Sequence, residues 1–197
     1  MNVLNNMPTE IDKWTRLKKN KPIEKKLVVS LNIFQYRYRL ARSFSSMTID
    51  GATARTVKGY TAFMKLFLAY SAYEEVQTAE IILLKNDKFE FHKIKNQTTL
   101  ASALRDNEKL KDLLINGIES EKSGLKKVLK KFYEGESDDI MCIATAARNS
   151  FAHGNLTVGG AGLSINSEFA VINKLANVLN DFSDTLFSKC LAEIEGT

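Results

Sequence analysis

Residues 147–154 read ARNSFAHG and contain side chains that can act on a phosphate group. Arg148 carries a planar fork of donors that suits phosphate oxygens. His153 carries an imidazole whose charge can change near neutral pH, and such a group is the usual acid or base in proton transfer. The pair indicates one half of a site that cleaves a nucleic acid.

A simpler interpretation of the same stretch is the end of a helix. Arg148 would then be a surface arginine paired with an acid of another helix, and His153 a residue of the last turn that stabilises the exposed carbonyl groups. Gly154 suits the left-handed conformation that often follows a helix. Residues five positions apart point about 140° apart on an ideal helix, so Arg148 and His153 converge only because arginine is long and the helix ends at the histidine.

A helix is expected over about residues 138–152, begun by Ser137 or Asp138 as its cap. Its core face consists of Ile140, Ile143, Ala144, Ala147 and Phe151. The opposite face is small and uncharged, with Cys142, Thr145, Ala146, Asn149, Ala152 and His153. Such a face is expected to be covered by another helix of the chain or by a second copy, and we predict a homodimer whose two motifs meet near a two-fold axis.

The two prolines, Pro8 and Pro22, both lie near the N-terminus, so the rest of the chain lacks the strongest helix breaker. We therefore predict an all-α fold, an antiparallel helical bundle with long central helices. Residues 1–21 are expected to form a flexible basic arm and residues 22–197 a single helical domain. Besides the motif helix, apolar periodicity predicts helices from residue 23 to about 42 and over residues 55–84, 98–116, 124–133 and 167–194. Residues 85–96 are expected to form a short edge strand or structured loop, and residues 154–167 a loop or small hairpin.

The net charge of +5 and the isoelectric point of about 9.1 favour an anionic partner, nucleic acid first. The positive charge is concentrated in residues 13–26 and 122–131, which are expected to be either walls of an RNA cleft or solvated faces.

No apolar run is long enough to span a bilayer, and the N-terminal residues do not resemble a signal peptide. Cys142 and Cys190 are interpreted as reduced core residues of a cytoplasmic protein. No spacing of cysteine and histidine suggests zinc, and we predict neither a metal nor a cofactor.

The string RNSFAHG resembles the signature of the HEPN superfamily, in which four to six residues separate an arginine from a histidine. Asparagine commonly follows that arginine, as Asn149 does here, and an Ala-His-Gly ending before a short glycine-containing hairpin is a familiar variant. The specific resemblance covers about ten residues, and the remainder of the chain matches in outline as a helical bundle with the motif on a late helix.

The resemblance implies a dimer whose two motifs face each other across a positive cleft, and a metal-independent endoribonuclease. Arg148 would hold the scissile phosphate, His153 would move protons during attack by the ribose 2′-hydroxyl, and Asn149 would orient the site. A 2′,3′-cyclic phosphate would be the product. RNA carries its own nucleophile, so a protein need only position it, shuttle protons and neutralise charge.

One position departs from the pattern. HEPN toxins paired with a nucleotidyltransferase antitoxin often have tyrosine two residues after the histidine, where this chain has Asn155. Tyrosine modification by such an antitoxin is therefore not predicted.

Three hypotheses follow. The first is an RNA-cleaving dimer acting as a toxin or phage-defence component, with an antitoxin or other regulatory protein as a further partner. The second is a non-catalytic HEPN-like module that binds RNA, a nucleotide or a partner protein. The third is a structural helical dimer without a ligand.

Other residues that could do chemistry are interpreted more simply. Glu74 and Glu75 either support the site or form ordinary ion pairs, and Tyr70 and Tyr73 are expected in the core. His92 has no partner types at ligand or catalytic spacing, so no role is predicted for it.

Overall fold

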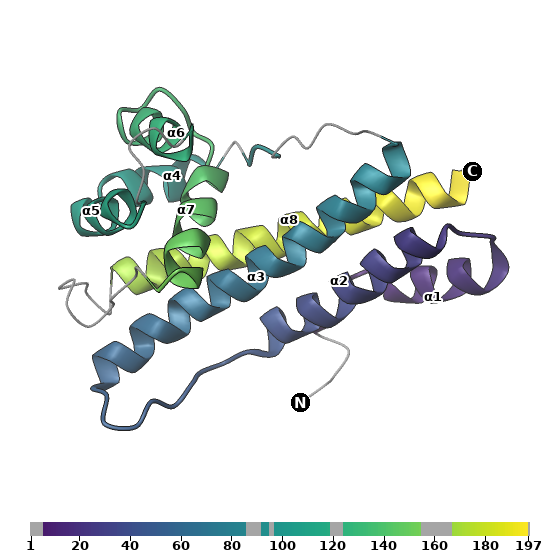
Figure 1. Ribbon diagram of the computed structural model, residues 1–197, viewed down its shortest axis with the longest axis horizontal. Helices are drawn as coiled ribbons and strands as arrows, with labels where there is room; N and C mark the ends of the chain where they lie inside the picture. The colour runs from purple at the N-terminus through teal and green to yellow at the C-terminus, as the bar shows by residue number, and fades with distance from the viewer. Residues whose placement is uncertain (1–5, 86–91, 95–96, 119–123, 155–166, 197) are drawn as a thin grey trace. The chain divides into compact units, whose positions relative to one another are not determined.

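In a computed structural model, residues 6–85, 92–94, 97–118, 124–154 and 167–196 are described (Figure 1). Every regular element in these residues is an α-helix, which confirms the predicted all-α class. The helices are α1 (Ile11–Asn20), α2 (Lys25–Ser43), α3 (Ala54–Leu84), α4 (Thr98–Arg105), α5 (Glu108–Asn116), α6 (Gly124–Tyr133), α7 (Met141–Ala152) and α8 (Glu168–Gly196). None of them, within the residues described, is both long and apolar enough to cross a membrane.

The chain divides into two compact units. The first comprises Met1–Phe44, Leu68–Glu90 and Asn177–Thr197, and the second comprises Ser45–Phe67 and Phe91–Ala176. Helices α3 and α8 each contribute residues to both units. The boundary predicted between residues 21 and 22 falls inside the first unit.

Aromatic side chains fill the core of the first unit. The ring of Phe34 on α2 lies 5.0 Å from that of Phe187 on α8 and 5.5 Å from that of Tyr38. The predicted buried face of α2 is confirmed, since its members are all buried: Leu27, Leu31, Phe34, Tyr38 and Ala41. Tyr70 and Tyr73 of α3 are buried as well. On α2 this set of apolar side chains, spaced three and four residues apart, thus forms the side that faces inward.

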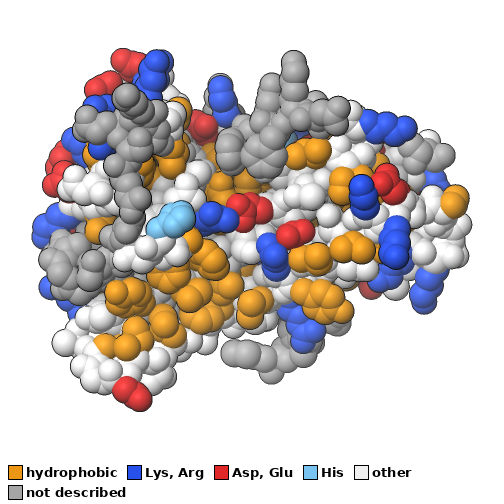
Figure 2. Space-filling model, in the orientation of Figure 1, with side chains coloured by type: hydrophobic (Ala, Val, Ile, Leu, Met, Phe, Trp, Pro, Cys, Tyr) orange, Lys and Arg blue, Asp and Glu red, His pale blue; other side chains and the backbone are white. Residues whose placement is uncertain are grey.

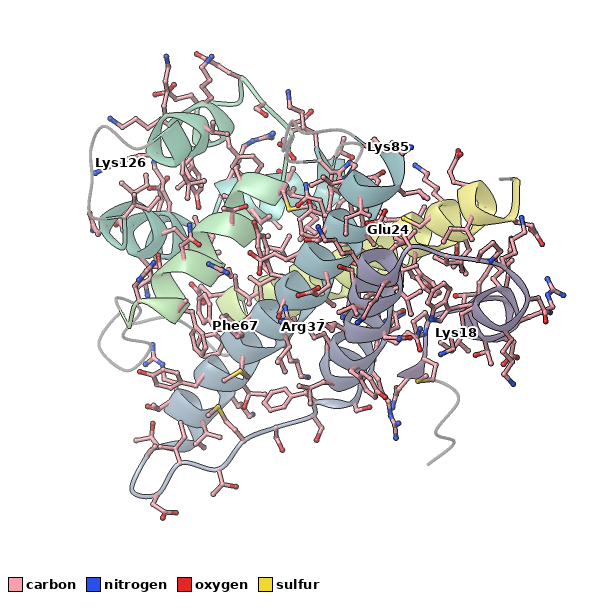
Figure 3. All side chains as sticks on the ribbon, turned by 45° about the vertical axis from the view of Figure 1, so that its right-hand side comes forward. Lys18, Glu24, Arg37, Phe67, Lys85 and Lys126 are labelled. Atoms are coloured by element: carbon pink, nitrogen blue, oxygen red, sulfur yellow. The ribbon has the colours of Figure 1, made fainter. Side chains whose placement is uncertain are left out.

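Charged side chains on the flanks of α2 join it to its neighbours. The guanidinium of Arg37 donates to Ser71 Oγ at 2.9 Å and pairs with Glu75 at 3.0 Å (Figure 3). Arg42 pairs with Asp181 of α8 at 2.9 Å. Of the two roles expected for the acidic pair in α3, ordinary ion pairing therefore holds for Glu75.

Residues 11–20 form helix α1, where the sequence pattern predicts part of a loose arm. Trp14 is fully buried, and its indole N–H donates to Asn32 Oδ1 at 3.2 Å. Leu17 lies one turn on and is also buried. The many lysines of this segment hide an amphipathic pattern, and burial of one large indole offsets the cost of ordering a short helix.

The prediction of a single helix over residues 98–116 is wrong. The segment forms two helices, because α4 ends at its C-terminal cap, Asp106, and α5 begins after Asn107. The Asn107 side chain accepts a hydrogen bond from the backbone N–H of Leu110 at 3.0 Å. An asparagine that caps a new helix in this way competes with continuation of the old one.

The residues before α7 are held by Arg105 of α4. Its guanidinium donates to the carbonyl oxygens of Phe132 and Ser137, each at 3.0 Å, and forms an ion pair with Asp138. It also lies 5.0 Å from the centre of the Phe132 ring. Arg105 therefore connects the end of α6 to the start of α7.

Two predicted segments lie largely outside the described residues. These are residues 86–91 and 95–96, in the expected edge strand or loop, and residues 155–166, in the expected loop or hairpin. Residues 92–94 have no regular structure. The backbone N–H of Ile94 donates to Asp139 Oδ1 at 3.0 Å, so this segment is attached to the start of α7.

Both cysteines are buried and free, as their segments predict. Burial raises the pKa of the Cys142 thiol and of the Cys190 thiol to about 12, from an ordinary value of 9.0. We expect a thiol-reactive dye at about pH 8 to label neither cysteine in the folded protein and both after denaturation, because the thiolate is the reactive form. Labelling at the rate of a free thiol would contradict this.

A thiol with a raised folded-state pKa contributes stability below about pH 9, and this contribution is lost as the pH rises towards 12.

Candidate active site

The N-terminal end of α7 is held by Asp139. Its Oδ1 accepts hydrogen bonds from the backbone N–H of Met141 at 3.1 Å and from that of Ile94 at 3.0 Å. Ser137 Oγ accepts a hydrogen bond from the N–H of Asp139 itself at 3.2 Å. The expectation that Ser137 or Asp138 caps the helix is therefore wrong: Asp139 receives the first helical amide, while Asp138 pairs with Arg105.

The predicted core face of α7 is confirmed for its first two turns. Ile140, Ile143, Ala144 and Ala147 are all buried. Phe151 is half-buried, and its ring centre lies 5.7 Å from that of Phe67 and 6.5 Å from that of Tyr60, both on α3. The contact between these three aromatic rings was not predicted from the sequence. The available signal was the spacing of Tyr60 and Phe67, which are seven residues apart and so share one face of α3.

The small, uncharged second face of α7 is covered at its beginning by the same chain. Helix α7 packs against α5 and α6, and Cys142 and Ala146 are buried. Gly117 at the end of α5 approaches α7 so closely that a Cβ there would lie 2.5 Å from Ser150 Oγ. The chain itself therefore provides one of the two predicted covers, and no second copy is needed over these turns.

The C-terminal end of the same helix is open. Ala152, His153 and Gly154 are exposed, and Arg148 and Asn149 are half-buried. Nη1 of Arg148 donates to Oδ1 of Asn149 at 3.1 Å. The three predicted site residues thus lie within the last turn and a half of α7, and the asparagine amide orients the guanidinium.

The helix ends at the histidine. His153 is the C-terminal cap of α7, and its backbone N–H donates to the carbonyl of Asn149 at 3.0 Å. Gly154 follows with a φ of 71°, which confirms the predicted left-handed residue past the helix end. The His153 side chain therefore stands at an exposed helix terminus and not midway along a packed helix.

We expect Gly154→Ala to lower the free energy of unfolding by about 1 kcal/mol, because a Cβ is strained at positive φ. Urea denaturation measures the change. Gly124→Ala, at the start of α6 where φ is not positive, is the matched control and should leave stability unchanged or slightly higher. Equal losses in the two variants would contradict the assignment of strain to residue 154.

Positive charge is carried by the helix beside α7. Helix α6 contacts α7, buries Leu129 and Phe132, and exposes Lys127, Lys130 and Lys131. The second lysine-rich segment is therefore adjacent to the motif helix, as a cleft wall would require. Among the residues described, no cluster of three or more histidine, cysteine, aspartate or glutamate side chains could hold a metal ion.

The groups at the C-terminal end of α7 are suited to two kinds of chemistry, binding of a phosphate and transfer of a proton. Arg148 presents donors that suit a phosphodiester oxygen. His153 presents an exposed imidazole that can accept or give a proton. Comparison with known proteins adds nothing further, because no family model matches the chain and no curated protein or solved structure is significantly similar to it.

Proposed function

We propose that this protein is a metal-independent endoribonuclease of HEPN type that acts as a dimer. The observation that carries the proposal is the open end of α7, where Arg148 is hydrogen-bonded to Asn149 and His153 is exposed at the helix terminus. The ARNSFAHG string and its place on a late helix support the same assignment.

The reaction follows from the groups available. His153 of one protomer takes the proton of the ribose 2′-hydroxyl, and the 2′-oxygen attacks phosphorus. The bond between phosphorus and the 5′-oxygen breaks, and protonated His153 of the other protomer gives its proton to that leaving oxygen. Arg148 neutralises the charge that develops on the non-bridging oxygens. The products are a 2′,3′-cyclic phosphate and a 5′-hydroxyl.

The dimer is part of the proposal because one chain supplies a single histidine at the motif. A general acid and a general base are both needed at the same phosphate, and two motifs meeting at a two-fold axis provide them. In this proposal the two copies meet at the exposed C-terminal end of α7, because the first turns of that helix are covered by the same chain.

The charge distribution favours RNA as the substrate. The net charge is +5, and the lysine-bearing helix α6 packs beside α7. An RNA strand passing Arg148 would then meet further cations, which raises its rate of association and makes binding sensitive to salt.

The direct test is incubation of the purified protein with RNA in the presence of EDTA. We expect fragments that end in a 2′,3′-cyclic phosphate and begin with a 5′-hydroxyl, and light scattering should give twice the chain mass of 22.1 kDa. Intact RNA over a range of sequences and salt concentrations would overturn the nuclease proposal. RNA that is bound but not cut would favour the non-catalytic module instead.

A role as a toxin or phage-defence component belongs to the same proposal. We expect induced expression of the wild-type chain to arrest bacterial growth and expression of a His153→Ala chain not to. Equal growth of both strains, with RNA cleavage still seen in vitro, would separate the biochemical activity from that role.

A further inference from the structure

Helix α2 carries an apolar stripe on the side that faces away from the core of the first unit. Val29, Tyr36 and Leu40 are 47%, 74% and 52% exposed, and Ile33 between them is half-buried. Their spacing of four, three and four residues places all four on one side of the helix. Single exposed apolar residues are common on protein surfaces, but an unbroken line along one helix face marks an interaction site.

The stripe is not an edge of the core. The opposite side of α2 is fully enclosed, with Leu31 and Phe34 at 0% exposure. With 100° per residue, the four stripe residues cover about 60° of the helix circumference. An apolar stripe this narrow, with residues repeating every three and four positions, is typical of the contact line, or seam, between two paired helices. A helix that lies in a membrane surface presents a broader apolar face.

Basic residues border the stripe on both sides. Lys25 and Arg39 lie on one rim and Lys26 on the other, all three exposed. Within the described part of the chain these three cations form no ion pair, whereas Arg37 and Arg42, nearer the core, pair with Glu75 and Asp181. In Figure 2, hydrophobic and basic side chains lie beside one another over α2.

The neighbouring helix adds to this charge. Lys18 of α1 has its Nζ 3.5 Å from Oδ1 of Asn32, which lies on the same rim as Arg39. Helix α2 itself contains no acidic residue between Lys25 and Ser43. The charges that α2 contributes to the rims of the stripe are therefore all positive.

We propose that the α2 seam, formed by Val29, Ile33, Tyr36 and Leu40 and bordered by Lys25, Lys26 and Arg39, is the docking surface for an acidic amphipathic helix of a partner protein. Such a helix would set its own apolar stripe against the seam and place glutamate or aspartate opposite the rims. This inference uses no residue of the proposed nuclease site and does not depend on that function.

A second copy of the chain is a poorer occupant of the same surface. Two α2 helices packed face to face would bring the basic rims of one against the basic rims of the other, and like charges across an interface oppose association. An acidic helix turns the same rims into attractive contacts.

The probe for this proposal is a synthetic three-heptad peptide with leucine and isoleucine along one face and glutamate beside it. Its binding to the full chain is followed by fluorescence anisotropy of a dye on the peptide. We expect saturable binding that weakens as salt is raised, because charges at the rims are screened. A peptide with lysine in place of each glutamate should bind at least about tenfold more weakly.

The variants locate the binding. Combining Tyr36→Ser with Leu40→Ser should weaken peptide binding by about tenfold or more, since exposed apolar anchors at the centre of a contact carry most of its energy. Val128→Ser, at an apolar residue of α6 that is 40% exposed, is the matched control and should bind as the wild type does. Lys25→Gln with Arg39→Gln should flatten the salt dependence. Urea denaturation confirms that each variant is folded.

Several results would overturn the proposal. They are absence of peptide binding, equal binding of the lysine peptide, and binding unchanged by the paired serine substitutions. A halved solution mass in the serine variant would assign the seam to a second copy. Binding of the wild type, but not of this variant, to vesicles of phosphatidylglycerol and phosphatidylcholine, without peptide binding, would assign the seam to a lipid surface.

Discussion

Replacing His153 by alanine is expected to reduce RNA cleavage by a factor of about 10² to 10⁴, which is the usual contribution of a general acid or base. The loss should appear in the rate at saturating RNA and not in RNA binding, because in the proposed mechanism the imidazole moves protons while cations hold the phosphate. Single-turnover cleavage and a filter-binding titration measure the two quantities separately.

The chain offers a matched control for this experiment in its second histidine. His92→Ala removes the same group from residues 92–94, which have no regular structure and contact the start of α7. We expect it to retain wild-type cleavage. Equal activity in His153→Ala and the wild type would remove the histidine from the mechanism, and equal losses in the two variants would point to a structural effect.

Arg148→Lys distinguishes the proposed roles further. Lysine keeps the positive charge but lacks the planar fork of donors, which in Arg148 donates to Asn149 and, in the proposed mechanism, also to a phosphate oxygen. If Arg148 acts on the phosphate as proposed, cleavage should fall while the free energy of unfolding remains close to that of the wild type.

Replacing Trp14 by alanine is expected to lower the free energy of unfolding by about 3–5 kcal/mol. The side chain is fully buried, and the substitution leaves a large cavity and also removes the hydrogen bond to Asn32. Denaturation in urea, followed by circular dichroism, measures the loss. A loose arm would give no loss, so this variant tests the packing of α1 directly.

Lys19→Ala is the control for Trp14, since Lys19 is exposed on the same helix. We expect its stability to stay within about 0.5 kcal/mol of the wild type. Trp14 is the sole tryptophan, so its fluorescence reports the same packing: the emission of the folded protein should lie well to the blue of that in urea. Emission at the solvent-exposed wavelength in the folded protein would contradict burial of α1.

The local pattern of apolar residues was sufficient to predict most of the helices. The three-and-four-residue recurrence from Leu27 to Ala41 predicts the buried side of α2, and the long apolar stretch in α3 predicts a helix among others. The end of α7 could also be predicted, because Gly154 is the residue type that tolerates the φ of 71° found there. These features depend on neighbours within a few residues.

Other features depend on distant residues and were missed. Trp14 lies in a lysine-rich segment, and its burial depends on contact with α2. The role of Asp139 depends on Ile94, 45 residues earlier in the chain. Arg105 joins two carbonyl oxygens and Asp138, none of which is close to it in sequence. The periodicity of apolar residues along the chain gives no information about such distant partners.

By itself, then, the sequence determined the helical class, the inward faces of α2 and α7, and the presence of an arginine, an asparagine and a histidine at one helix end. Tertiary structure decided which parts of these helices are open. It covered Cys142 and Ala146 of α7 with α5 and α6 and left His153 exposed. It also left the seam of α2 uncovered while pairing Arg37 and Arg42 with acids. The physical reason is that spacing along a helix says which residues share a face, whereas exposure depends on segments that fold against that face from far away in the chain.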